Sequence, residues 1–247
     1  MSTNIIFGKR IVLDMLNKSP SKIEIVWIQK NRSKNINEIL KSCQNNKIRY
    51  QFVPKEKLDK ICGERHQGIA AKIFLPGFVD EYELISMLNS SKLPLILALD
   101  QVQDQGNIGA LARTLYGLGG SGIVITKFRS AQLGERAIKS SSGALLHLPV
   151  ARTQNLKSFL KFCADKGIFT YFTGTNDYCE NVYSLDLNFP AVLVLGNEEK
   201  GVRKTVRDKC QMGLKIPMLR DFDSLNVAQA GAILMGEFLR TWLKKIV

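Results

Sequence analysis

The sequence contains few residues that could bind a metal ion. Its 247 residues include only two histidines, His66 and His147. Neither has cysteine or acidic residues around it at the spacing of a metal-ligand set. We therefore expect no metal in this protein, and we expect any catalysis to use arginine, asparagine, glutamate, serine or lysine.

Cysteines are also sparse, and long apolar runs are missing. The five cysteines are scattered, odd in number and without a C-x-x-C pair: Cys43, Cys62, Cys163, Cys179 and Cys210. This pattern favours free thiols in a reducing cytoplasm over a disulfide framework. No run of about 18 apolar residues is present, so the sequence predicts no membrane span. The N-terminal segment has no basic stretch followed by an unbroken apolar one, so we expect no secretory signal.

Negative charge is scarce relative to positive charge. The chain has 35 Lys and Arg against 22 Asp and Glu, a formal net charge of +13. Residues 1–92 hold 16 basic and 9 acidic residues, and residues 93–247 hold 19 and 13, so the N-terminal part is more basic per residue. Such an excess favours a polyanionic partner. A solvated surface tuned for solubility is the alternative that charge alone leaves open.

The hydrophobic pattern predicts two α/β units joined by a linker. Residues 1–76 alternate strand and helix patterns, which indicates a small α/β domain, and residues 77–92 form the linker. Residues 93–247 alternate near-continuous apolar strands with helices, which predicts a mostly parallel sheet covered on both faces. The expected strands are 23–29, 48–53, 69–75, 94–100, 121–126, 145–150, 168–174, 191–196 and 213–217; the expected helices are 8–17, 35–45, 54–62, 107–118, 134–142, 154–166 and 224–244.

Two glycine patterns resemble nucleotide-binding motifs but lack their context. Residues 117–122 read G-L-G-G-S-G, yet a helix is expected before them and a strand after them, the reverse of the dinucleotide-binding order. A helix end and tight turn explain these glycines better. Gly196 and Gly201 have P-loop spacing, but Val202 and Arg203 stand where Lys and Ser or Thr are required. We expect no nucleotide hydrolysis.

Three polar segments follow expected strands of the second unit, at the end where α/β sheets bind ligands. They are DQVQDQGNIGALART (100–114), LVLGNEEKGV (193–202) and IPMLRDFDSLNVAQAGAILMGE (216–237). Each residue type has an ordinary explanation when taken singly. Arg113 could form a surface ion pair, Glu198 could be a solvated loop residue, and Ser224 could be a helix N-cap.

Together these segments resemble the three motifs of the SpoU (TrmH-like) class of SPOUT methyltransferases. The first motif matches at Asn107, Gly109 and Arg113, and the second at Gly196, Glu198 and Gly201. The third matches at Ile-Pro-Met 216–218 and Ser-Leu-Asn-Val 224–227. The segments GKRIVLDMLN and RHQGIAAKI also resemble the small RNA-binding domain of RlmB-type 23S rRNA guanosine methyltransferases, a fold shared with kink-turn-binding ribosomal proteins.

This resemblance implies an α/β fold with a deep trefoil knot near the C-terminus, a homodimer whose protomers both contribute to the site, and S-adenosylmethionine as cofactor. It places the cofactor against Gly196, Ile216, Met218 and Leu225. It implies catalytic roles for Arg113, Asn107, Glu198, Ser224 and Asn226. The chain departs from the usual pattern at Asn197, where Ser is frequent, and at Ala228-Gln229, which affects fine positioning.

Methyl transfer to a ribose needs an oxygen nucleophile held in line with the sulfonium methyl group. A hydroxyl is a poor nucleophile until a base or a hydrogen-bond acceptor takes its proton. Arg113 is the base that the resemblance suggests, but a guanidinium with a pKa above about 12 gives up its proton reluctantly. We favour Arg113 as a grip on the adjacent phosphate, and the sequence leaves the identity of the base open.

The function expected from the sequence is S-adenosylmethionine-dependent methylation of a ribose 2′-hydroxyl in RNA, with a guanosine of 23S ribosomal RNA as target. A tRNA 2′-O-methyltransferase is one alternative. A non-catalytic RNA-binding protein on the same fold is another, although Arg113 and Asn226 are both present. A nucleotide-dependent α/β enzyme is disfavoured by the reversed glycine pattern. The expected partners are therefore RNA and a second copy of the chain, without membrane or metal.

Overall fold

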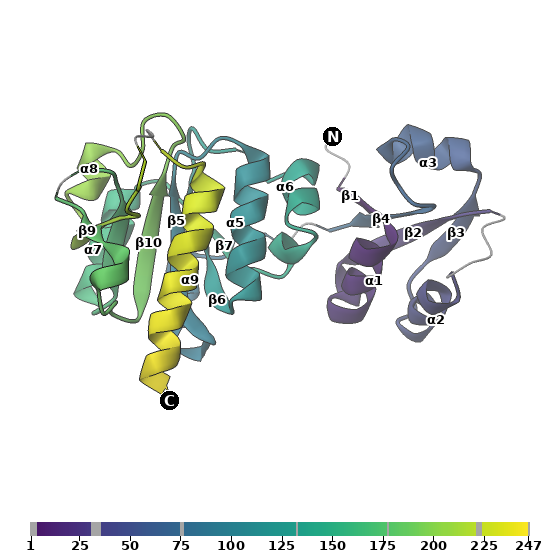
Figure 1. Ribbon diagram of the computed structural model, residues 1–247. Helices are drawn as coiled ribbons and strands as arrows, with labels where there is room; N and C mark the ends of the chain where they lie inside the picture. Colours follow the sequence, from purple (N-terminus) through teal and green to yellow (C-terminus); the bar gives the residue numbers. More distant parts are fainter. Residues whose placement is uncertain are drawn as a thin grey trace.

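The strands of the chain form two separate sheets, each packed against helices, and Figure 1 shows the two units side by side. The computed structural model describes residues 4–30, 36–74, 77–131, 133–176, 178–220 and 224–246. Within these ranges one sheet has four strands and the other has seven. The predicted boundaries at 1–76, 77–92 and 93–247 stay a prediction, and residues 75 and 76, where the expected strand 69–75 ends, lie outside the described residues.

The N-terminal unit packs helices against a mixed sheet in the order β1-β4-β2-β3. β4 is antiparallel to both β1 and β2, whereas β2 and β3 are parallel. Val12, Met15 and Leu16, the apolar stripe of α1, are fully buried in its core. The elements are β1 (Ile5–Phe7), α1 (Lys9–Lys18), β2 (Ile23–Gln29), α2 (Asn37–Asn45), β3 (Tyr50–Val53), α3 (Lys55–Cys62) and β4 (Ile69–Ile73).

The second unit contains a parallel sheet in the order β7-β6-β5-β10-β8-β11-β9, which confirms the predicted α/β fold class. Its central strands β5 and β10 are buried at every residue, as expected for strands covered on both faces. The elements are α4 (Glu81–Ser86), β5 (Leu93–Asp100), α5 (Gln105–Gly117), β6 (Gly120–Thr126), α6 (Glu135–Ser140), β7 (Val150–Thr153), α7 (Leu156–Asp165), β8 (Phe169–Thr173), β9 (Glu180–Asn181), β10 (Ala191–Gly196), α8 (Lys204–Arg207), β11 (Met212–Lys215) and α9 (Val227–Ile246).

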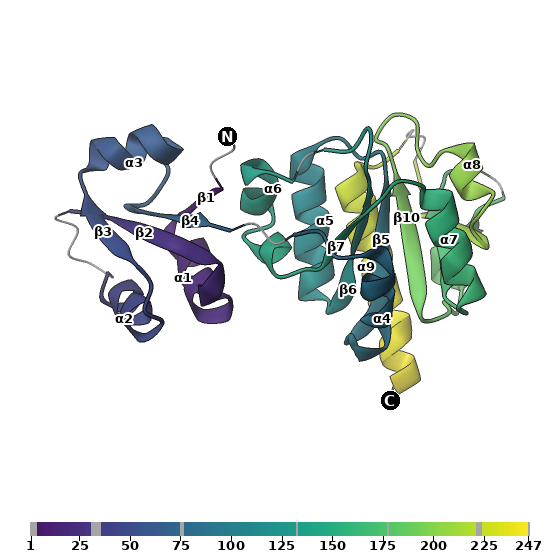
Figure 2. The ribbon, with the colours of Figure 1, turned by 180° about the vertical axis from the view of Figure 1, so that it is seen from behind.

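Helices cover this sheet on both sides. α5 and α9 pack against one face through a large apolar cluster that includes Leu111, Leu115, Leu234 and Phe238. α4 and α7 cover the other face, as the view from behind shows (Figure 2). The trefoil knot that the resemblance implies stays a prediction.

One expected strand is wrong. Residues Ala144–Leu146 form a 3-10 turn, and the strand predicted at 145–150 begins only at Val150. Gly143 precedes the turn with a φ of 87°, which redirects the chain after α6. Leu145 and Leu146 are consecutive and both buried, because they pack beneath the helices instead of alternating across a sheet. The apolar residues at 145–149 therefore do not form the predicted strand.

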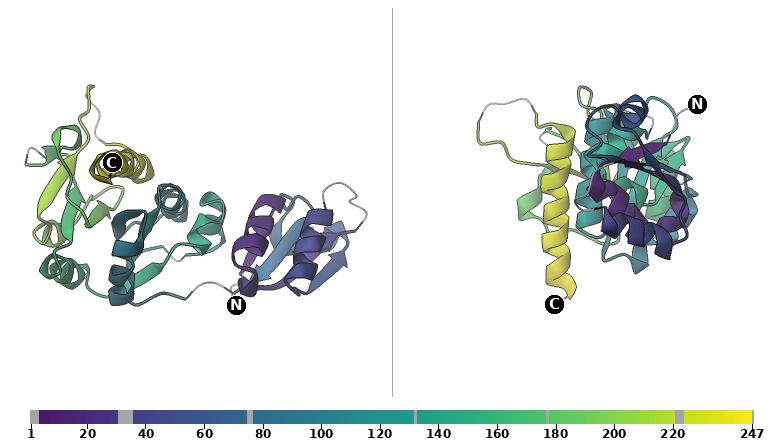
Figure 3. Two further views of the ribbon diagram at one scale, coloured as in Figure 1. Left: turned by 90° about the horizontal axis from the view of Figure 1, so that it is seen from below. Right: turned by 90° about the vertical axis from the view of Figure 1, so that its right-hand side faces the viewer.

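The 3-10 turn at Ala144–Leu146 and the following His147 connect the second unit to the first. His147 hydrogen-bonds through Nε2 to the Asp14 carboxylate at 2.8 Å and through Nδ1 to the Ser19 hydroxyl at 3.4 Å. Lys22 donates to the carbonyl of Leu146 at 3.0 Å. Seen from below, the first unit lies beside α6 and this turn (Figure 3). Burial raises the pKa of Asp14, but hydrogen bonds from Lys18 and His147 outweigh it and lower the pKa below its ordinary value.

Candidate functional site

Two loops that carry predicted site residues leave the sheet at the same point. β5 ends at Asp100 and the neighbouring β10 ends at Gly196, and these two residues pair in register. The chain continues from β5 into α5 and from β10 into the loop 197–203. α9 begins at this end of the sheet as well, at the top of Figure 1. The three polar segments therefore meet where a parallel sheet is expected to bind its ligand.

The first turn of α5 fixes the position of Asn107. Asp104 is the N-cap, and its carboxylate accepts a hydrogen bond from the backbone N–H of Asn107 at 2.8 Å. The same carboxylate forms an ion pair with Arg136 at 3.0 Å, which ties the helix start to α6. The Asn107 side chain therefore projects from an anchored helix end.

A chain of hydrogen bonds connects the three motifs through Asn107. The Asn226 amide donates to Asn107 Oδ1 at 3.1 Å, and Asn107 Nδ2 donates to Glu198 Oε1 at 2.9 Å. Asn197 donates to the other carboxylate oxygen of Glu198 at 3.3 Å and to the carbonyl of Gln101 at 3.1 Å. Both Glu198 oxygens thus have amide donors, and the carboxylate is held in one orientation.

Asn226 also caps α9. Its side-chain oxygen accepts from the backbone N–H groups of Ala228 at 2.8 Å and Gln229 at 3.4 Å. The helix expected from residue 224 therefore starts at Val227, and the N-cap role considered for Ser224 belongs to Asn226. Ser224 is exposed and lines the adjacent cavity.

A cavity of about 450 Å³ opens beside this chain of hydrogen bonds. All four predicted cofactor residues line it, together with Glu198 and Ser224: Gly196, Ile216, Met218 and Leu225. Thr173, the last residue of β8, and Gly174, which follows it, also line the cavity, and no motif in the sequence indicated them. Strand order carries that information, because β8 is adjacent to β10 only in the folded sheet.

Gly196 is required by the path of the backbone around this cavity. A Cβ atom at this position would lie 2.1 Å from the backbone carbon of Gly201 and 2.1 Å from the nitrogen of Val202. The loop folds back over the strand end, and Asn197 and Gly201 exchange backbone hydrogen bonds of 3.2 and 2.9 Å. Only glycine permits this close approach of the loop to the end of β10.

Family models match both units. Residues 94–236 match the model described as SpoU rRNA Methylase family, and residues 5–78 match the model described as RNA 2′-O ribose methyltransferase substrate binding. YacO of Bacillus subtilis (strain 168), assigned to the TrmH family of tRNA/rRNA methyltransferases, is 33% identical over 237 residues, covering 95% of this chain and 94% of that protein. The chain belongs to the SpoU rRNA methylase family.

Solved structures agree with this SpoU fold. The SpoU methyltransferase AviRb from Streptomyces viridochromogenes superposes with a TM-score of 0.80 at 19% identity, covering 99% of this chain and 91% of that one. An AdoMet-bound rRNA methyltransferase from Sinorhizobium meliloti gives a TM-score of 0.79 at 22% identity, covering 96% of this chain and 87% of that one. The predicted resemblance is therefore confirmed.

Arg113 stands apart from the other motif residues of this SpoU methylase. It is exposed in the second half of α5 and does not line the cavity. The helical rise places it about 9 Å along the axis from Asn107. Within the described residues it has no hydrogen bond or ion pair to the remainder of the site. The chain of hydrogen bonds therefore joins Asn107, Glu198 and Asn226 but does not include Arg113.

Asp100 is a site-forming residue that the sequence analysis missed. It is fully buried and accepts hydrogen bonds from the backbone N–H and the Nε of Arg203, both at 2.9 Å. This pair holds the far end of the loop 197–203 against β5. An aspartate that ends the apolar run PLILALD was the available signal, since a buried carboxylate requires a partner.

The histidines have structural partners. His66 hydrogen-bonds to Asp59 at 2.9 Å and accepts the backbone N–H of Gly68 at 2.8 Å, and His147 joins the two units. Among the described residues no cluster of three or more His, Cys, Asp or Glu could hold a metal ion. None of the helices in these described residues has both the length and the apolar character needed to cross a membrane.

Proposed function

We propose that this SpoU methylase transfers a methyl group from S-adenosylmethionine to a ribose 2′-hydroxyl in RNA. The observation that carries this proposal is that the three motifs are joined by hydrogen bonds beside a cavity that the second and third motifs line. In the sequence, Glu198 lies 91 residues and Asn226 lies 119 residues from Asn107. The three side chains nevertheless form one chain of hydrogen bonds. A protein that only bound RNA would not need this arrangement beside a small-molecule-sized cavity.

The cavity fits the predicted cofactor. Its volume is in the range of small-molecule sites, which are apolar with a few placed polar groups. Ile216, Met218 and Leu225 supply apolar walls, and Gly196 contributes the end of β10 to the lining. These four residues would hold S-adenosylmethionine, and the bound cofactor would supply an electrophilic methyl group. Two structurally similar proteins are described with AdoMet bound.

The chain's polar residues would orient the attacking hydroxyl. Glu198 lines the cavity and is locked by two amide donors, so its remaining lone pairs face a fixed direction. Ser224, which lines the cavity, and Asn107, which holds Glu198, would help to direct the ribose. Arg113 would grip the neighbouring phosphate, and because it lies away from the cavity of its own chain, we propose that it serves the site of a second copy in a homodimer.

We propose a guanosine of 23S ribosomal RNA as the target, with tRNA as the alternative. The basic N-terminal unit, which matches a substrate-binding model, favours a large folded RNA. A cytoplasmic location agrees with five cysteines that are all free. Mapping of ribose methylation by mass spectrometry, in rRNA and tRNA from cells with and without the gene, tests this choice. Loss of a methyl group from tRNA alone would rule out the rRNA target.

Metal removal is expected to leave the enzyme unchanged. Neither the cavity nor its surroundings offers a ligand cluster among the described residues, and the proposed chemistry uses no metal. Binding of S-adenosylmethionine, measured by calorimetry with and without EDTA, should therefore give the same affinity. A divalent ion that is required for cofactor binding in the absence of RNA would contradict this expectation.

Deletion of residues 1–76 is expected to weaken RNA binding while leaving cofactor binding largely intact. That segment carries 15 Lys and Arg against 6 Asp and Glu, whereas the cavity lies entirely in the second unit. Filter binding of RNA and calorimetry with S-adenosylmethionine on the same truncated protein separate the two effects. If the truncated protein methylates RNA as efficiently as the full chain, the N-terminal unit has another role.

A further inference from the structure

A second cavity of about 450 Å³ lies where the linker meets the edge of the large sheet. We call it the linker cleft. Phe78 of the linker and the loop Lys127–Ala131, which follows β6, form its rim. Its floor is apolar and is made by Leu133, Ile138, Leu145, Leu148 and Val150. The linker is fixed against β7, because Val79 donates to the carbonyl of Val150 at 2.9 Å.

Cations and exposed aromatic rings surround the linker cleft. The Arg152 guanidinium lies 4.0 Å from the centre of the Phe78 ring, and Lys127 lies 5.6 Å from that of Phe128. Phe78 is 45% exposed and Phe128 is 66% exposed. None of the described residues that line the cleft is acidic. Cations interleaved with aromatic rings are typical of surfaces that bind unpaired nucleic acid.

The loop that presents these groups is held in place. The Thr126 hydroxyl hydrogen-bonds to the carbonyl of Phe128 at 3.0 Å and to the Ser130 hydroxyl at 2.6 Å. The backbone of Lys127 bonds to Thr153 at 2.8 Å. Arg129 has a φ of 58°, an uncommon conformation for a residue with a side chain. Exposed Phe128 is therefore displayed by an ordered loop.

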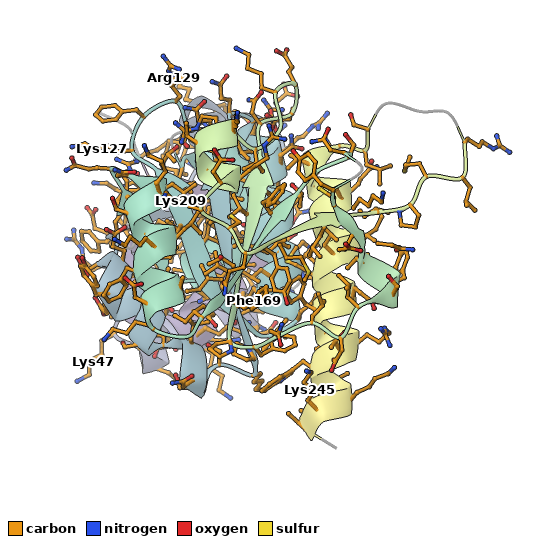
Figure 4. All side chains as sticks on the ribbon, turned by 90° about the vertical axis from the view of Figure 1, so that its left-hand side faces the viewer. Lys47, Lys127, Arg129, Phe169, Lys209 and Lys245 are labelled. Atoms are coloured by element: carbon orange, nitrogen blue, oxygen red, sulfur yellow. The ribbon has the colours of Figure 1, made fainter. Side chains whose placement is uncertain are left out.

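The linker cleft and the candidate active site share one end of the sheet. β6 pairs with β5, which pairs with β10, so Thr126 and Gly196 end strands that are two positions apart. At about 4.8 Å per strand this separation is about 10 Å. Lys127 and Arg129 project from the end of the molecule at which α9 begins (Figure 4). One RNA strand could therefore reach both places.

We propose that the linker cleft binds an unpaired nucleotide near the one that is methylated. The base lies on the apolar floor beside Phe78, and Lys127 and Arg152 contact the flanking phosphates. The absence of acidic lining and the interleaved aromatic rings favour RNA over a second protein chain, because like-charged rims on two copies would repel each other. The proposal rests on the proposed function in taking RNA as the ligand and in placing the methylated nucleotide at the neighbouring cavity.

The test uses the full-length protein and two fluorescein-labelled probes of equal charge, hexauridylate and its abasic counterpart, without S-adenosylmethionine. Fluorescence anisotropy should show tighter binding of hexauridylate. Phe78→Ala should remove most of this preference, about tenfold in Kd, which corresponds to loss of one base contact. Phe78→Leu keeps an apolar side chain in the linker and controls for disruption of its packing. This variant should lose less of the preference for hexauridylate than Phe78→Ala does.

The charged rim is tested by the double variant Lys127→Gln and Arg152→Gln. Both probes should bind about tenfold more weakly. The slope of log affinity against log salt concentration should fall by the amount expected for the loss of about two phosphate contacts. The matched control is Lys157→Gln with Lys161→Gln, two exposed cations on α7 at the other face of the sheet, and it should bind both probes like the wild type. Thermal unfolding confirms that each variant is folded.

Crosslinking provides an independent readout. A hexamer with 4-thiouridine should crosslink to peptides that contain Phe78 or Phe128. Equal affinity for the two probes in the wild type, or crosslinks elsewhere only, would overturn the linker cleft proposal even if the protein methylates RNA. Variants that change sedimentation but not RNA binding would assign the cleft to a second copy instead. Methylation activity, measured separately, reports on the proposed function.

Discussion

Replacement of Arg113 by alanine is expected to abolish most methyl transfer while the affinity for S-adenosylmethionine changes little. Arg113 is exposed on α5 and does not line the cofactor cavity, so its loss leaves that cavity intact. A group that positions or deprotonates a nucleophile contributes about 10²–10⁴-fold to the rate. Calorimetry for cofactor binding and single-turnover methylation should be measured on the same preparation.

Arg113→Lys is the conservative control and should rescue poorly, because an ammonium cannot reproduce the planar two-pronged grip of a guanidinium on a phosphate. A full rescue by lysine would reduce the role to a simple positive charge. If Arg113→Ala instead loses cofactor binding and dimerisation while the remaining complex still reacts, Arg113 is a structural residue.

Mixing two inactive variants distinguishes a role within one chain from a role across a dimer. Arg113→Ala keeps its own cavity, and Gly196→Ala keeps Arg113. If Arg113 serves the partner's site, each mixed dimer has one complete site, and random mixing should restore about a quarter of the wild-type rate. No recovery in a mixture shown to contain mixed dimers would mean that Arg113 acts in its own chain.

Gly196→Ala is expected to disrupt cofactor binding. The added Cβ would lie 2.1 Å from two backbone atoms of the loop 197–203, and backbone moves aside less readily than the end of a flexible side chain. Overpacking costs about 1–3 kcal/mol, which corresponds to about tenfold to a hundredfold in affinity if the loop shifts to accommodate it. Calorimetric titration with S-adenosylmethionine measures this loss.

Gly117→Ala is the matched control for Gly196→Ala. Gly117 ends α5, and an added Cβ there meets no atom within 4 Å. Cofactor affinity should remain at the wild-type value, and thermal stability should be equal or slightly higher. If Gly196→Ala binds S-adenosylmethionine as well as Gly117→Ala does, the cavity beside β10 is not the cofactor site.

The sequence pattern predicted the parallel sheet of the second unit, but it did not predict every strand or the contact between the two units. The segments 94–100 and 191–196 are apolar at nearly every residue, because β5 and β10 are covered on both faces. Such a run is visible in a short stretch of sequence and predicts a strand of a parallel sheet. The strand at 145–150 failed because its apolar residues pack under helices, and periodicity alone cannot distinguish that environment from a sheet. The contact of His147 with Asp14 depends on how two units dock, which no local pattern records.

The candidate site shows a similar division. Only the family resemblance predicts that Asn107, Glu198 and Asn226 belong to one site, since no spacing in the sequence indicates that they touch. The structure adds the reasons: Asn226 caps α9, and Glu198 takes donors from two asparagines. The linker cleft and the Asp100–Arg203 pair were not predicted, because each joins segments that become neighbours only through strand order.

The most direct measurement is the chemical identity of the methylated product. The purified full-length protein is incubated with isotope-labelled S-adenosylmethionine and rRNA from cells that lack the gene. The RNA is then digested to nucleosides and analysed by mass spectrometry, with Arg113→Ala in parallel. We predict label in a 2′-O-methylnucleoside, expected to be 2′-O-methylguanosine, and little label with the variant. Label confined to a base, or none in RNA from any source while the protein binds the cofactor, would contradict the assignment as a ribose 2′-O-methyltransferase.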